Sequence, residues 1–334
     1  MKALVLHGPQ NLVYEPEWQV PTTPDGWALV KVHASGICGS DLPRIMQTGA
    51  YHHPMIPGHE FSGEISLPGS SSLSPGARVA VLPIIPCGKC DGCQIGPFHC
   101  THYDFIGSRR DGGFTEFCPV PAENLFPLPN SLTYEDGAFI EPIAVTLHVV
   151  RRSGMTSGAR VLVFGAGAIG ILTAQWAKIL GAREVVVADL RQESLSIARN
   201  CGLENAVDPR TEEFSRLGNF DFVFEAAGST PALLSGIEHA TARSVLTVVG
   251  REVKDTVIPQ PVFERLMRKE LTLAGCWGYD LKGDSDLVHQ VLEKGQLVLA
   301  PMITHRLNLE EGPQFIEAMW KKSLFYCKAQ FVLG

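Results

Sequence analysis

The chain has 334 residues, of which 45% are hydrophobic and 19% charged, enough for two folded domains of about 150 residues each. This composition excludes a disordered or low-complexity protein and favours a soluble globular one. The 28 Lys and Arg residues against 35 Asp and Glu residues leave a net charge of −7, which excludes a general attraction to nucleic acid or to an anionic membrane. An anionic ligand therefore needs a local group of cations.

The first residues and the cysteines indicate a cytoplasmic protein. The apolar run at residues 3–6 is too short for a signal peptide, and no segment reaches the roughly 18 consecutive apolar residues of a membrane span. The cysteines number nine, and four of them lie within residues 87–100, a spacing that suits a metal better than a set of disulfides. We therefore expect reduced thiols.

In chain order, the pattern changes from mainly β to alternating β and α. Residues 1–148 are rich in Gly and Pro, with short strands predicted at 28–32 and 78–82. Beyond residue 149 strands and helices alternate, which indicates a parallel, doubly wound sheet. Its predicted elements are strands at 161–164, 185–188, 222–225, 245–249 and 271–274, and a helix at 169–180. The tail adds predicted helices at 285–294 and 310–322 and a strand at 329–333.

One group of candidate metal ligands consists only of cysteines. Four cysteines stand in the order C-x-x-C-x-x-C followed by six residues and a fourth; they are Cys87, Cys90, Cys93 and Cys100. Four thiolates on a tight loop match tetrahedral zinc, and a closed set leaves no position for a substrate, so we expect a structural zinc in a lobe at about residues 85–102. An iron–sulfur cluster and a chance group of free thiols are the alternatives.

A second set of ligand residues, earlier in the chain, has the composition of an open site. Cys38 precedes His59 and Glu60 by about twenty residues, and Glu141 adds a further carboxylate. A thiolate, an imidazole and one carboxylate leave the fourth position of a tetrahedral zinc for an exchangeable ligand. The His-Glu pair also begins a zincin helix, but Gly63 stands where that motif has its second histidine.

A glycine motif marks a dinucleotide site. The G-x-G-x-x-G pattern follows the predicted strand at 161–164 and opens the predicted helix; its cofactor-binding residues are Gly165, Gly167, Ala168, Ile169 and Gly170. The glycines permit the turn, the approach of the pyrophosphate and the packing of helix on strand. Asp189 ends the next predicted strand, where its carboxylate can accept a hydrogen bond from a ribose 2′-hydroxyl and repel a 2′-phosphate. We therefore expect NAD, and only the nearby Arg191 favours NADP.

Together with these motifs, three longer segments carry a family resemblance. Residues 38–45, 103–114 and 135–142 resemble the polyol dehydrogenase branch of the zinc-dependent medium-chain dehydrogenases, and the likeness covers essentially the whole chain. Two features depart from the family pattern. Six residues rather than seven precede Cys100, and the loop at 67–74 is shorter.

The resemblance implies an α/β fold of two domains. A GroES-like, mainly-β catalytic domain at residues 1–148 and 278–334 is expected to be interrupted by a doubly wound, parallel-sheet Rossmann domain at 149–277. The expected cofactors are two zinc ions per chain and NAD. The expected assembly is a homodimer or homotetramer, with the subunits meeting at the edge strand near residues 271–276. No nucleic acid or membrane partner is expected.

The resemblance also implies roles for the residues of the open site. Cys38 and His59 would hold the catalytic zinc together with either Glu60 or Glu141, and the sequence leaves open which glutamate binds directly. Asp41 would orient His59 as a hydrogen-bond acceptor. Ser40 would accept the proton of the alcohol, on a relay that reaches solvent past His52 or the adjacent His53.

The segments quoted above are most similar to those of members that oxidise galactitol 1-phosphate to tagatose 6-phosphate, which is the expected reaction. Arginines near the site would bind the phosphate dianion in this acidic protein. Arg306 resembles a substrate-side arginine of sorbitol-oxidising members. The residues expected around the substrate are Arg44, Tyr51, Arg109, Arg110, Trp277 and Arg306, with Glu225 as a further candidate. The alternative for each arginine is that it is only a solvated surface residue, and for each aromatic residue that it only packs inside the protein.

Other activities stay open at this point. Within the class, the substrate can be a free polyol such as sorbitol or altritol, or a pentitol phosphate such as ribitol 5-phosphate or arabitol phosphate. Outside it, a zinc-free quinone or enoyl reductase has the same fold, and a non-enzymatic NAD-binding protein is a third candidate. The set of Cys38, His59 and Glu141 argues against both of these, because neither needs an open zinc site.

Overall fold

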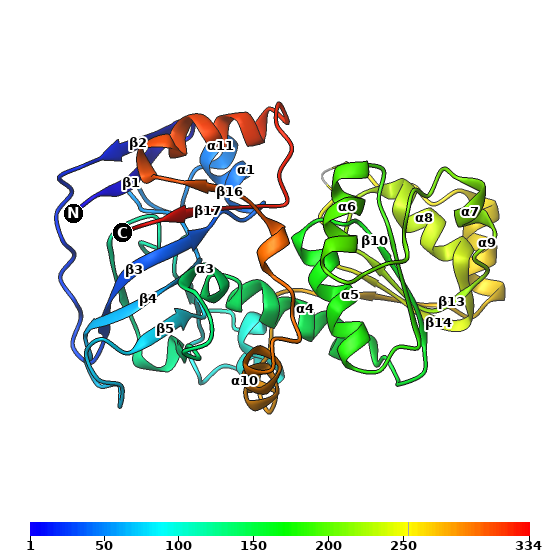
Figure 1. Cartoon of the computed structure of the whole chain (residues 1–334), viewed down its shortest axis with the longest axis horizontal. Helices are drawn as coiled ribbons and strands as arrows, with labels where there is room; N and C mark the ends of the chain where they lie inside the picture. The colour runs from blue at the N-terminus through cyan, green and yellow to red at the C-terminus, as the bar shows by residue number, and fades with distance from the viewer. Residues whose placement is uncertain (253) are drawn as a thin grey trace. The chain divides into compact units, whose positions relative to one another are not determined.

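The computed structural model describes residues 1–252 and 254–334, which form two compact units (Figure 1). The first consists of Met1–Glu141 and Ile303–Gly334, and the second is Pro142–Met302, so one unit is inserted into the other. The predicted limits of the Rossmann domain, residues 149 and 277, fall inside the second unit and stay a prediction. Among the described residues, no helix has the length and apolar character needed to cross a bilayer.

A seven-stranded sheet lies at the centre of the first unit. Its order is β16-β17-β3-β4-β5-β9, with β8 also paired to β3. The strands are β3 (Ala28–Gly36), β4 (Glu60–Leu67), β5 (Arg78–Val81), β8 (Phe117–Val120), β9 (Leu125–Pro127), β16 (Ile303–Leu307) and β17 (Lys328–Val332). Both β4 and β17 run antiparallel to β3, and Gly36 is paired with Glu60 on one side and with Gln330 on the other. This register brings the two ends of the first unit's sequence together.

Shorter elements complete the first unit. They are β1 (Ala3–Gly8), β2 (Asn11–Glu15), β6 (Ile84–Ile85), β7 (Asp104–Phe105), α1 (Asp41–Pro43), α2 (Asp91–Ile95), α3 (Tyr134–Gly137), the start of α4 (Ile140–Ser153) and α11 (Gly312–Trp320). The core under the sheet contains Phe61, Phe114 and Phe331, and the last two rings meet edge to face at 4.9 Å. The strands predicted at 28–32, 78–82 and 329–333 are thereby confirmed.

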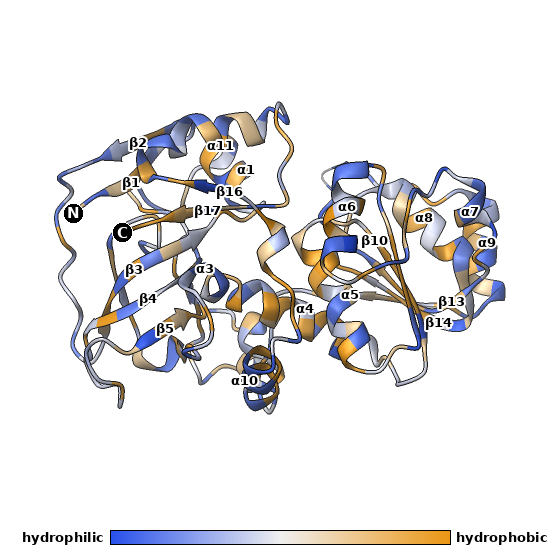
Figure 2. Ribbon diagram, viewed as in Figure 1, coloured by the Kyte–Doolittle hydropathy of each residue, from blue (hydrophilic) through white to orange (hydrophobic). Residues whose placement is uncertain are grey.

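The second unit is a six-stranded parallel sheet of order β12-β11-β10-β13-β14-β15. The strands are β10 (Arg160–Phe164), β11 (Glu184–Ala188), β12 (Ala206–Val207), β13 (Phe220–Glu225), β14 (Ala240–Val248) and β15 (Thr272–Gly275). The helices are α5 (Ala168–Ile179), α6 (Gln192–Asn200), α7 (Glu212–Ser215), α8 (Thr230–His239), α9 (Gln260–Arg268) and α10 (Ser285–Glu293), besides most of α4. In Figure 2 the strands β10, β13 and β14 are largely hydrophobic, as expected of a parallel sheet covered on both faces. The predicted Rossmann fold is confirmed.

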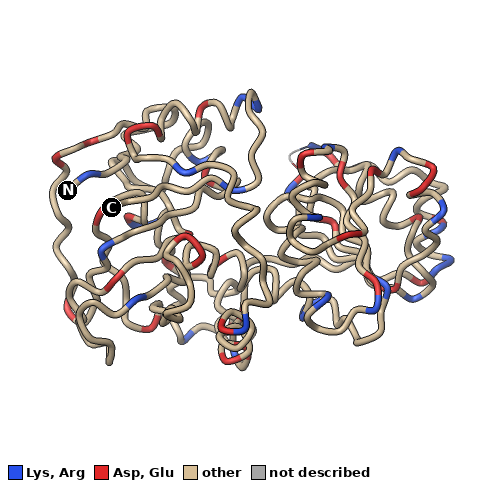
Figure 3. The backbone as a smooth tube through the Cα atoms, in the orientation of Figure 1, with Lys and Arg blue, Asp and Glu red and all other residues tan. Residues whose placement is uncertain are grey.

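The order of strands reverses between β10 and β13, so the loops that follow these two strands border the crevice where such sheets bind ligands. Figure 3 shows Lys and Arg residues interspersed with Asp and Glu residues on both units. The net charge of −7 is thus spread over the chain rather than gathered in one segment.

Candidate functional site

Cys38, His59 and Glu60 form a mixed ligand set in the first unit. Cys38 follows β3, His59 immediately precedes β4 and Glu60 is its first residue, and one ligand atom from each lies within 4.8 Å of the others. A zinc ion with bonds of about 2.0–2.3 Å to such atoms is compatible with this spacing. His59 and Glu60 are buried, so a bound cation would neutralise charge that otherwise lies inside the protein.

Asp41 fixes the imidazole of this set. It is fully buried at the start of α1; its Oδ1 lies 3.3 Å from His59 Nδ1, and its Oδ2 accepts a hydrogen bond from the Cys38 amide at 3.1 Å. Burial favours a raised pKa for Asp41, but His59 and Arg44 outweigh it and hold the pKa below 3.8. Burial likewise favours a low pKa for His59, but Asp41 and Cys38 raise that pKa well above 6.5. With Nδ1 beside the Asp41 carboxylate, Nε2 is the ring nitrogen that remains for a metal.

Glu60 has a partner that sequence reasoning missed. Lys328, buried at the start of β17, donates from Nζ to Glu60 Oε2 at 2.5 Å. Burial favours a lowered pKa for Lys328, but Glu60 and Cys38 raise it. Gly36 makes room for the carboxylate, because a Cβ at this position would lie 2.4 Å from Glu60 Oε2. The side chain of Glu60 thus lies over a strand position without a side chain, held by a lysine two strands away.

Glu141 lies close to the ligand set but outside it. It is buried in the first turn of α4, and its ligand atoms do not fall within the 4.8 Å group of the described residues. Burial raises the pKa of Glu141 to about 7, with His59 lowering it and Glu60 raising it. The structure thus places Glu60, rather than Glu141, beside Cys38 and His59.

Ser40 lies beside the ligand set of Cys38, His59 and Glu60, whereas His52 is exposed. Ser40 Oγ lies 3.3 Å from Cys38 Sγ, so its hydroxyl is next to the metal-ligand atoms. His52 is exposed, with Nδ1 3.2 Å from the Pro54 carbonyl oxygen. The adjacent His53 has its Nδ1 3.1 Å from the Leu6 carbonyl oxygen, and its Nε2 accepts from the Ala50 amide.

The four predicted cysteines meet in a separate cluster. The Sγ atoms are 3.9 Å apart for Cys87 and Cys93, 3.5 Å for Cys90 and Cys93, and 3.8 Å for Cys90 and Cys100. A tetrahedron with zinc–sulfur bonds of about 2.3 Å has edges of about 3.8 Å. Hydrogen bonds from the amides of Thr101 and Cys93 lower the pKa of Cys90 to about 5, which favours the thiolate. The six residues between Cys93 and Cys100 are therefore enough to bring the fourth sulfur into the cluster.

The glycine loop of the second unit has the shape required for a pyrophosphate. Gly165 has φ +98°, and a Cβ there would lie 2.8 Å from the Ala227 amide nitrogen. A Cβ on Gly170 would lie 1.7 Å from the Gly165 carbonyl oxygen, whereas one on Gly167 would meet nothing within 4 Å. Gly167 is also the N-cap of α5 and supplies no side-chain cap. Open space above unpaired helix amides fits a phosphate group.

Asp189 follows β11 and is tied to this loop. Its Oδ2 accepts from the Ala166 amide at 2.7 Å and its Oδ1 from the Arg191 amide at 2.9 Å. Arg191 is exposed at the N-cap of α6. The carboxylate is thus fixed beside the glycine loop, at the end of the strand next to β10, which is where a dinucleotide places its adenosine ribose.

Glu225 joins further loops at the same edge of the sheet. It ends β13, paired with Phe164 of β10, and is 2% exposed. Its Oε1 accepts from the amides of Ala227 at 3.1 Å and Ser229 at 3.3 Å, and its carbonyl accepts from Val249 and Gly250. Burial raises the pKa of Glu225, although these amides lower it.

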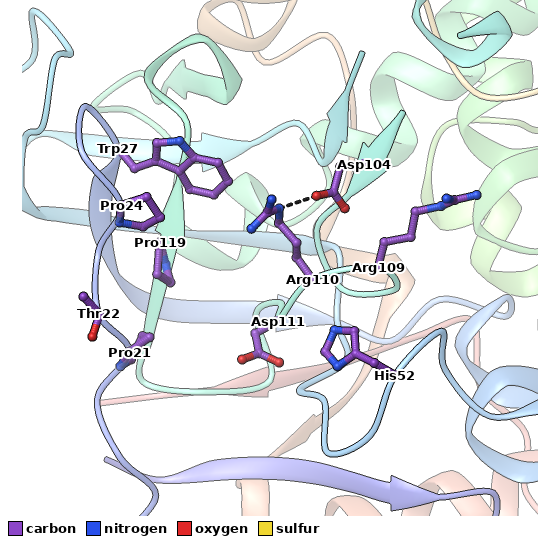
Figure 4. Close-up of a pocket in the computed structure, with 10 residues that line it drawn as sticks. All are labelled: Pro21, Thr22, Pro24, Trp27, His52, Asp104, Arg109, Arg110, Asp111 and Pro119. Atoms are coloured by element: carbon purple, nitrogen blue, oxygen red, sulfur yellow. Dashed lines mark ion pairs between the residues drawn. The ribbon is translucent and has the colours of Figure 1, made fainter. Parts of the chain in front are cut away.

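Most of the arginines expected at the substrate are engaged by carboxylates. Arg44 donates to Asp41 at 3.0 Å and Arg306 to Glu135 at 2.7 Å. Arg110 pairs with Asp104 and stacks on Trp27, beside a surface depression of about 380 Å³ that His52 also lines. Figure 4 shows the side chains of Arg109 and Arg110 pointing in opposite directions, so they do not form one cation cluster.

Tyr51 and Trp277 are largely exposed, at 68% and 67%, and belong to different units. Tyr51 stacks on Arg109, whereas Trp277 follows the edge strand β15. Tyr103, the other ring on Arg109, and Lys328 are the residues that sequence reasoning missed. The segment 103–114 contained the signal for Tyr103, but nothing near Lys328 in sequence points to a metal site.

Fold and ligand sets together define a zinc-binding dehydrogenase, a mainly-β unit with an inserted nucleotide-binding sheet. Residues 24–130 match the alcohol dehydrogenase GroES-like domain family, and residues 168–294 match the zinc-binding dehydrogenase family. The chain is 37% identical to galactitol 1-phosphate 5-dehydrogenase of Escherichia coli (strain K12) over 309 residues, 88% of this chain and 89% of that protein. It is 32% identical to L-threonine 3-dehydrogenase of Rhizobium johnstonii over 336 residues, 96% and 95% of the two chains.

Solved structures agree. The crystal structure of galactitol-1-phosphate dehydrogenase from Escherichia coli has a TM-score of 0.90 at 34% identity, with 100% of both chains covered. A zinc-binding dehydrogenase from Sinorhizobium meliloti 1021 bound to NADP has a TM-score of 0.89 at 29% identity, with 99% of both chains covered. The chain belongs to the zinc-binding medium-chain dehydrogenases, and is a zinc- and NAD(P)-dependent alcohol or polyol dehydrogenase.

Proposed function

We propose that the chain oxidises galactitol 1-phosphate to tagatose 6-phosphate with NAD⁺. The observation that carries the proposal is the ligand set of Cys38, His59 and Glu60 in a chain 37% identical to a galactitol 1-phosphate 5-dehydrogenase. Three protein ligands leave one position of a tetrahedral zinc for the substrate hydroxyl. Glu60 is proposed as the direct ligand because it falls within the set, and Glu141 as the carboxylate that can exchange with it.

Residues of the chain orient the substrate and carry its proton. When bound, zinc lowers the pKa of a coordinated hydroxyl and NAD⁺ accepts a hydride, so the C–H bond breaks and the alcohol loses two electrons. Asp41 holds the His59 ring, and Ser40 takes the hydroxyl proton beside Cys38 and passes it toward solvent past His52. In the lobe, Cys87, Cys90, Cys93 and Cys100 would hold a second, structural zinc.

The decisive experiment follows NADH absorbance across paired free and phosphorylated polyols. The panel is galactitol and its 1-phosphate, sorbitol, altritol, ribitol 5-phosphate and arabitol phosphate. The expected result is the highest kcat/KM for galactitol 1-phosphate. A higher value for any free polyol or pentitol phosphate overturns the substrate assignment, and the absence of turnover with every polyol overturns the activity. Metal analysis of the same sample should find two zinc ions per chain.

The proposed cofactor is NAD rather than NADP. Support comes from Asp189, whose carboxylate is fixed by the Ala166 and Arg191 amides at the end of β11. A 2′-phosphate near this carboxylate would place like charges side by side, which costs several-fold or more in affinity. We expect kcat/KM for NAD⁺ to exceed that for NADP⁺ by about tenfold or more, and Asp189→Ala to narrow the difference. A preference of the unaltered enzyme for NADP⁺ contradicts the assignment.

We also propose a homodimer, formed through the free edge of the nucleotide-binding sheet. Strand β15 ends the strand order, and Leu273 on it is 46% exposed. Helix α9 adds exposed Phe263 and Met267, and none of its residues is buried. An unpaired, apolar edge is a surface that natural proteins cover.

A cytoplasmic location stays a prediction.

A further inference from the structure

The first unit contains five arginines, all among the described residues, and Arg109 differs from the other four. Four of them donate to carboxylates or main-chain carbonyls: Arg44 to Asp41, Arg110 to Asp104, Arg306 to Glu135, and Arg78 to the carbonyls of Pro129, Asn130 and Leu132. Arg109 has no such acceptor among the described residues. Its Nε is buried without a hydrogen-bond partner. Among the described residues, the terminal nitrogens contact only the hydroxyls of Tyr51 and Tyr103, so some of their N–H donors remain for an acceptor from outside the chain.

Two aromatic rings hold the Arg109 guanidinium in place. Its central carbon lies 4.3 Å from the ring centroid of Tyr51 and 4.3 Å from that of Tyr103. The contact to the Tyr51 hydroxyl is long, at 3.4 Å. A guanidinium stacked in this way donates in its own plane, and its flat fork matches two oxygens of a phosphate. The stacking therefore pre-orients the group for an oxyanion.

Main-chain packing ties Arg109 to the metal-ligand set. Its amide donates to the carbonyl of Phe105 at 2.9 Å, and the Phe105 ring meets the His59 ring edge to face at 5.6 Å between centroids. The turn is packed tightly on the residue before His59. A Cβ on Gly107 would lie 2.3 Å, and one on Gly112 2.0 Å, from the Gly58 carbonyl oxygen. Arg109 thus extends from a turn in contact with a metal ligand.

We propose that Arg109, held between Tyr51 and Tyr103, binds the phosphate of the substrate and sets the preference for a phosphorylated over a free polyol. The inference rests on the proposed function and narrows the phosphate-binding role to one of the four arginines expected around the substrate. With a net charge of −7, the protein offers little general attraction for a dianion, so a single oriented guanidinium has a large effect on selectivity.

The test compares kcat/KM for galactitol 1-phosphate and for galactitol in matched variants. Arg109→Ala should lower the value for the phosphate ester about 100-fold while lowering that for galactitol less than about threefold. Arg109→Lys, which keeps the charge but loses the fork, should recover part of the loss. Arg110→Ala is the matched control, and its ratio between the two substrates should match that of the unaltered enzyme because Arg110 faces Asp104.

A second pair of variants tests the stacking. Tyr103→Ala should reduce the ratio about threefold to tenfold, since one cation–π contact is lost. Tyr103→Phe keeps the ring but loses the hydroxyl that interacts with the guanidinium, and should reduce the ratio less. Inorganic phosphate should inhibit competitively against galactitol 1-phosphate, and more weakly in Arg109→Ala.

The outcomes separate this inference from the function on which it rests. If the unaltered enzyme prefers the phosphate ester and Arg109→Ala lowers both substrates equally, the role of Arg109 is wrong and the proposed reaction stands. If the unaltered enzyme prefers free galactitol, the proposed substrate is wrong as well. A loss of selectivity in Arg110→Ala equal to that in Arg109→Ala would also overturn the assignment to Arg109.

Discussion

Lys328 and Glu60 form a buried ion pair whose strength depends on their burial. The side chains of this pair are 6% and 2% exposed, and the charged atoms are 2.5 Å apart. Lys328→Met would leave a buried carboxylate with no basic partner, a change that costs about 3–5 kcal/mol in other buried pairs. We expect a loss of this size in the free energy of unfolding, measured with urea on the metal-free protein, in which no zinc ion compensates the Glu60 carboxylate.

The first unit offers a matched control for this prediction. Lys321 and Glu317 form an ion pair of the same length on α11 and its C-cap, but their side chains are 63% and 49% exposed. Lys321→Met should lower the free energy of unfolding by less than about 1 kcal/mol, because exposed pairs contribute little. Equal losses for the two variants would show that the Lys328 pair has no special weight.

At this scale, the sequence indicated candidate metal ligands but not the residues that surround them. Cys38, His59 and a choice between Glu60 and Glu141 could be predicted because the types and spacing of these residues specify a ligand chemistry. Lys328 could not, because its partner is 268 residues away and only the strand pairing brings them together. The same holds for the carboxylate partners of the candidate arginines, of which Glu135 is 171 residues from Arg306.

Among the elements, β13 ends in a carboxylate that has no basic partner among its described contacts. Because burial raises the pKa of Glu225 above 4.5, the folded state binds its proton more tightly than the unfolded state does. Its contribution to stability is therefore present at low pH and is lost as pH rises through the unfolded and then the folded pKa. Glu225→Gln cannot ionise and can still accept from the Ala227 and Ser229 amides.

The prediction follows from that sign. The unfolding temperature of Glu225→Gln minus that of the unaltered protein should increase with pH from about 4.5 upward. Differential scanning calorimetry across this range measures it. Glu184→Gln is the control of opposite sign, since Arg160 lowers the pKa of Glu184. A difference that shrinks with rising pH for Glu225→Gln would contradict the burial argument.

The regular elements were the most predictable level of the structure. Strands of a parallel sheet are buried on both faces and appear as short apolar runs, and all five strands predicted in the second unit are present. The small strands β6, β7 and β12, each of two residues, were not predicted. Their existence depends on neighbouring segments rather than on their own composition, so a local pattern cannot indicate them.

At the scale of the whole molecule, the edge strand β15 is the surface through which we expect two chains to form a dimer. Pairing of β15 with its copy in another chain would cover the exposed side chain of Leu273. Leu273→Asp should therefore convert a dimer into a monomer in sedimentation velocity runs. Ile95→Asp removes an equally exposed apolar side chain from the lobe, where it is 71% exposed, and should leave the dimer intact. A monomer in the unaltered protein would overturn the proposed interface.

The strand order of the first unit also has a consequence for synthesis of the chain. Glu60 leaves the ribosome early, whereas the lysine that neutralises it lies 268 residues later, after the entire inserted unit Pro142–Met302. Strand β17, which carries Lys328, can pair with β3 only after that unit has been translated. Until then the Glu60 carboxylate of the nascent chain must be hydrated or bound to metal. Its buried ion pair with Lys328 can form only after nearly the whole chain has been synthesised.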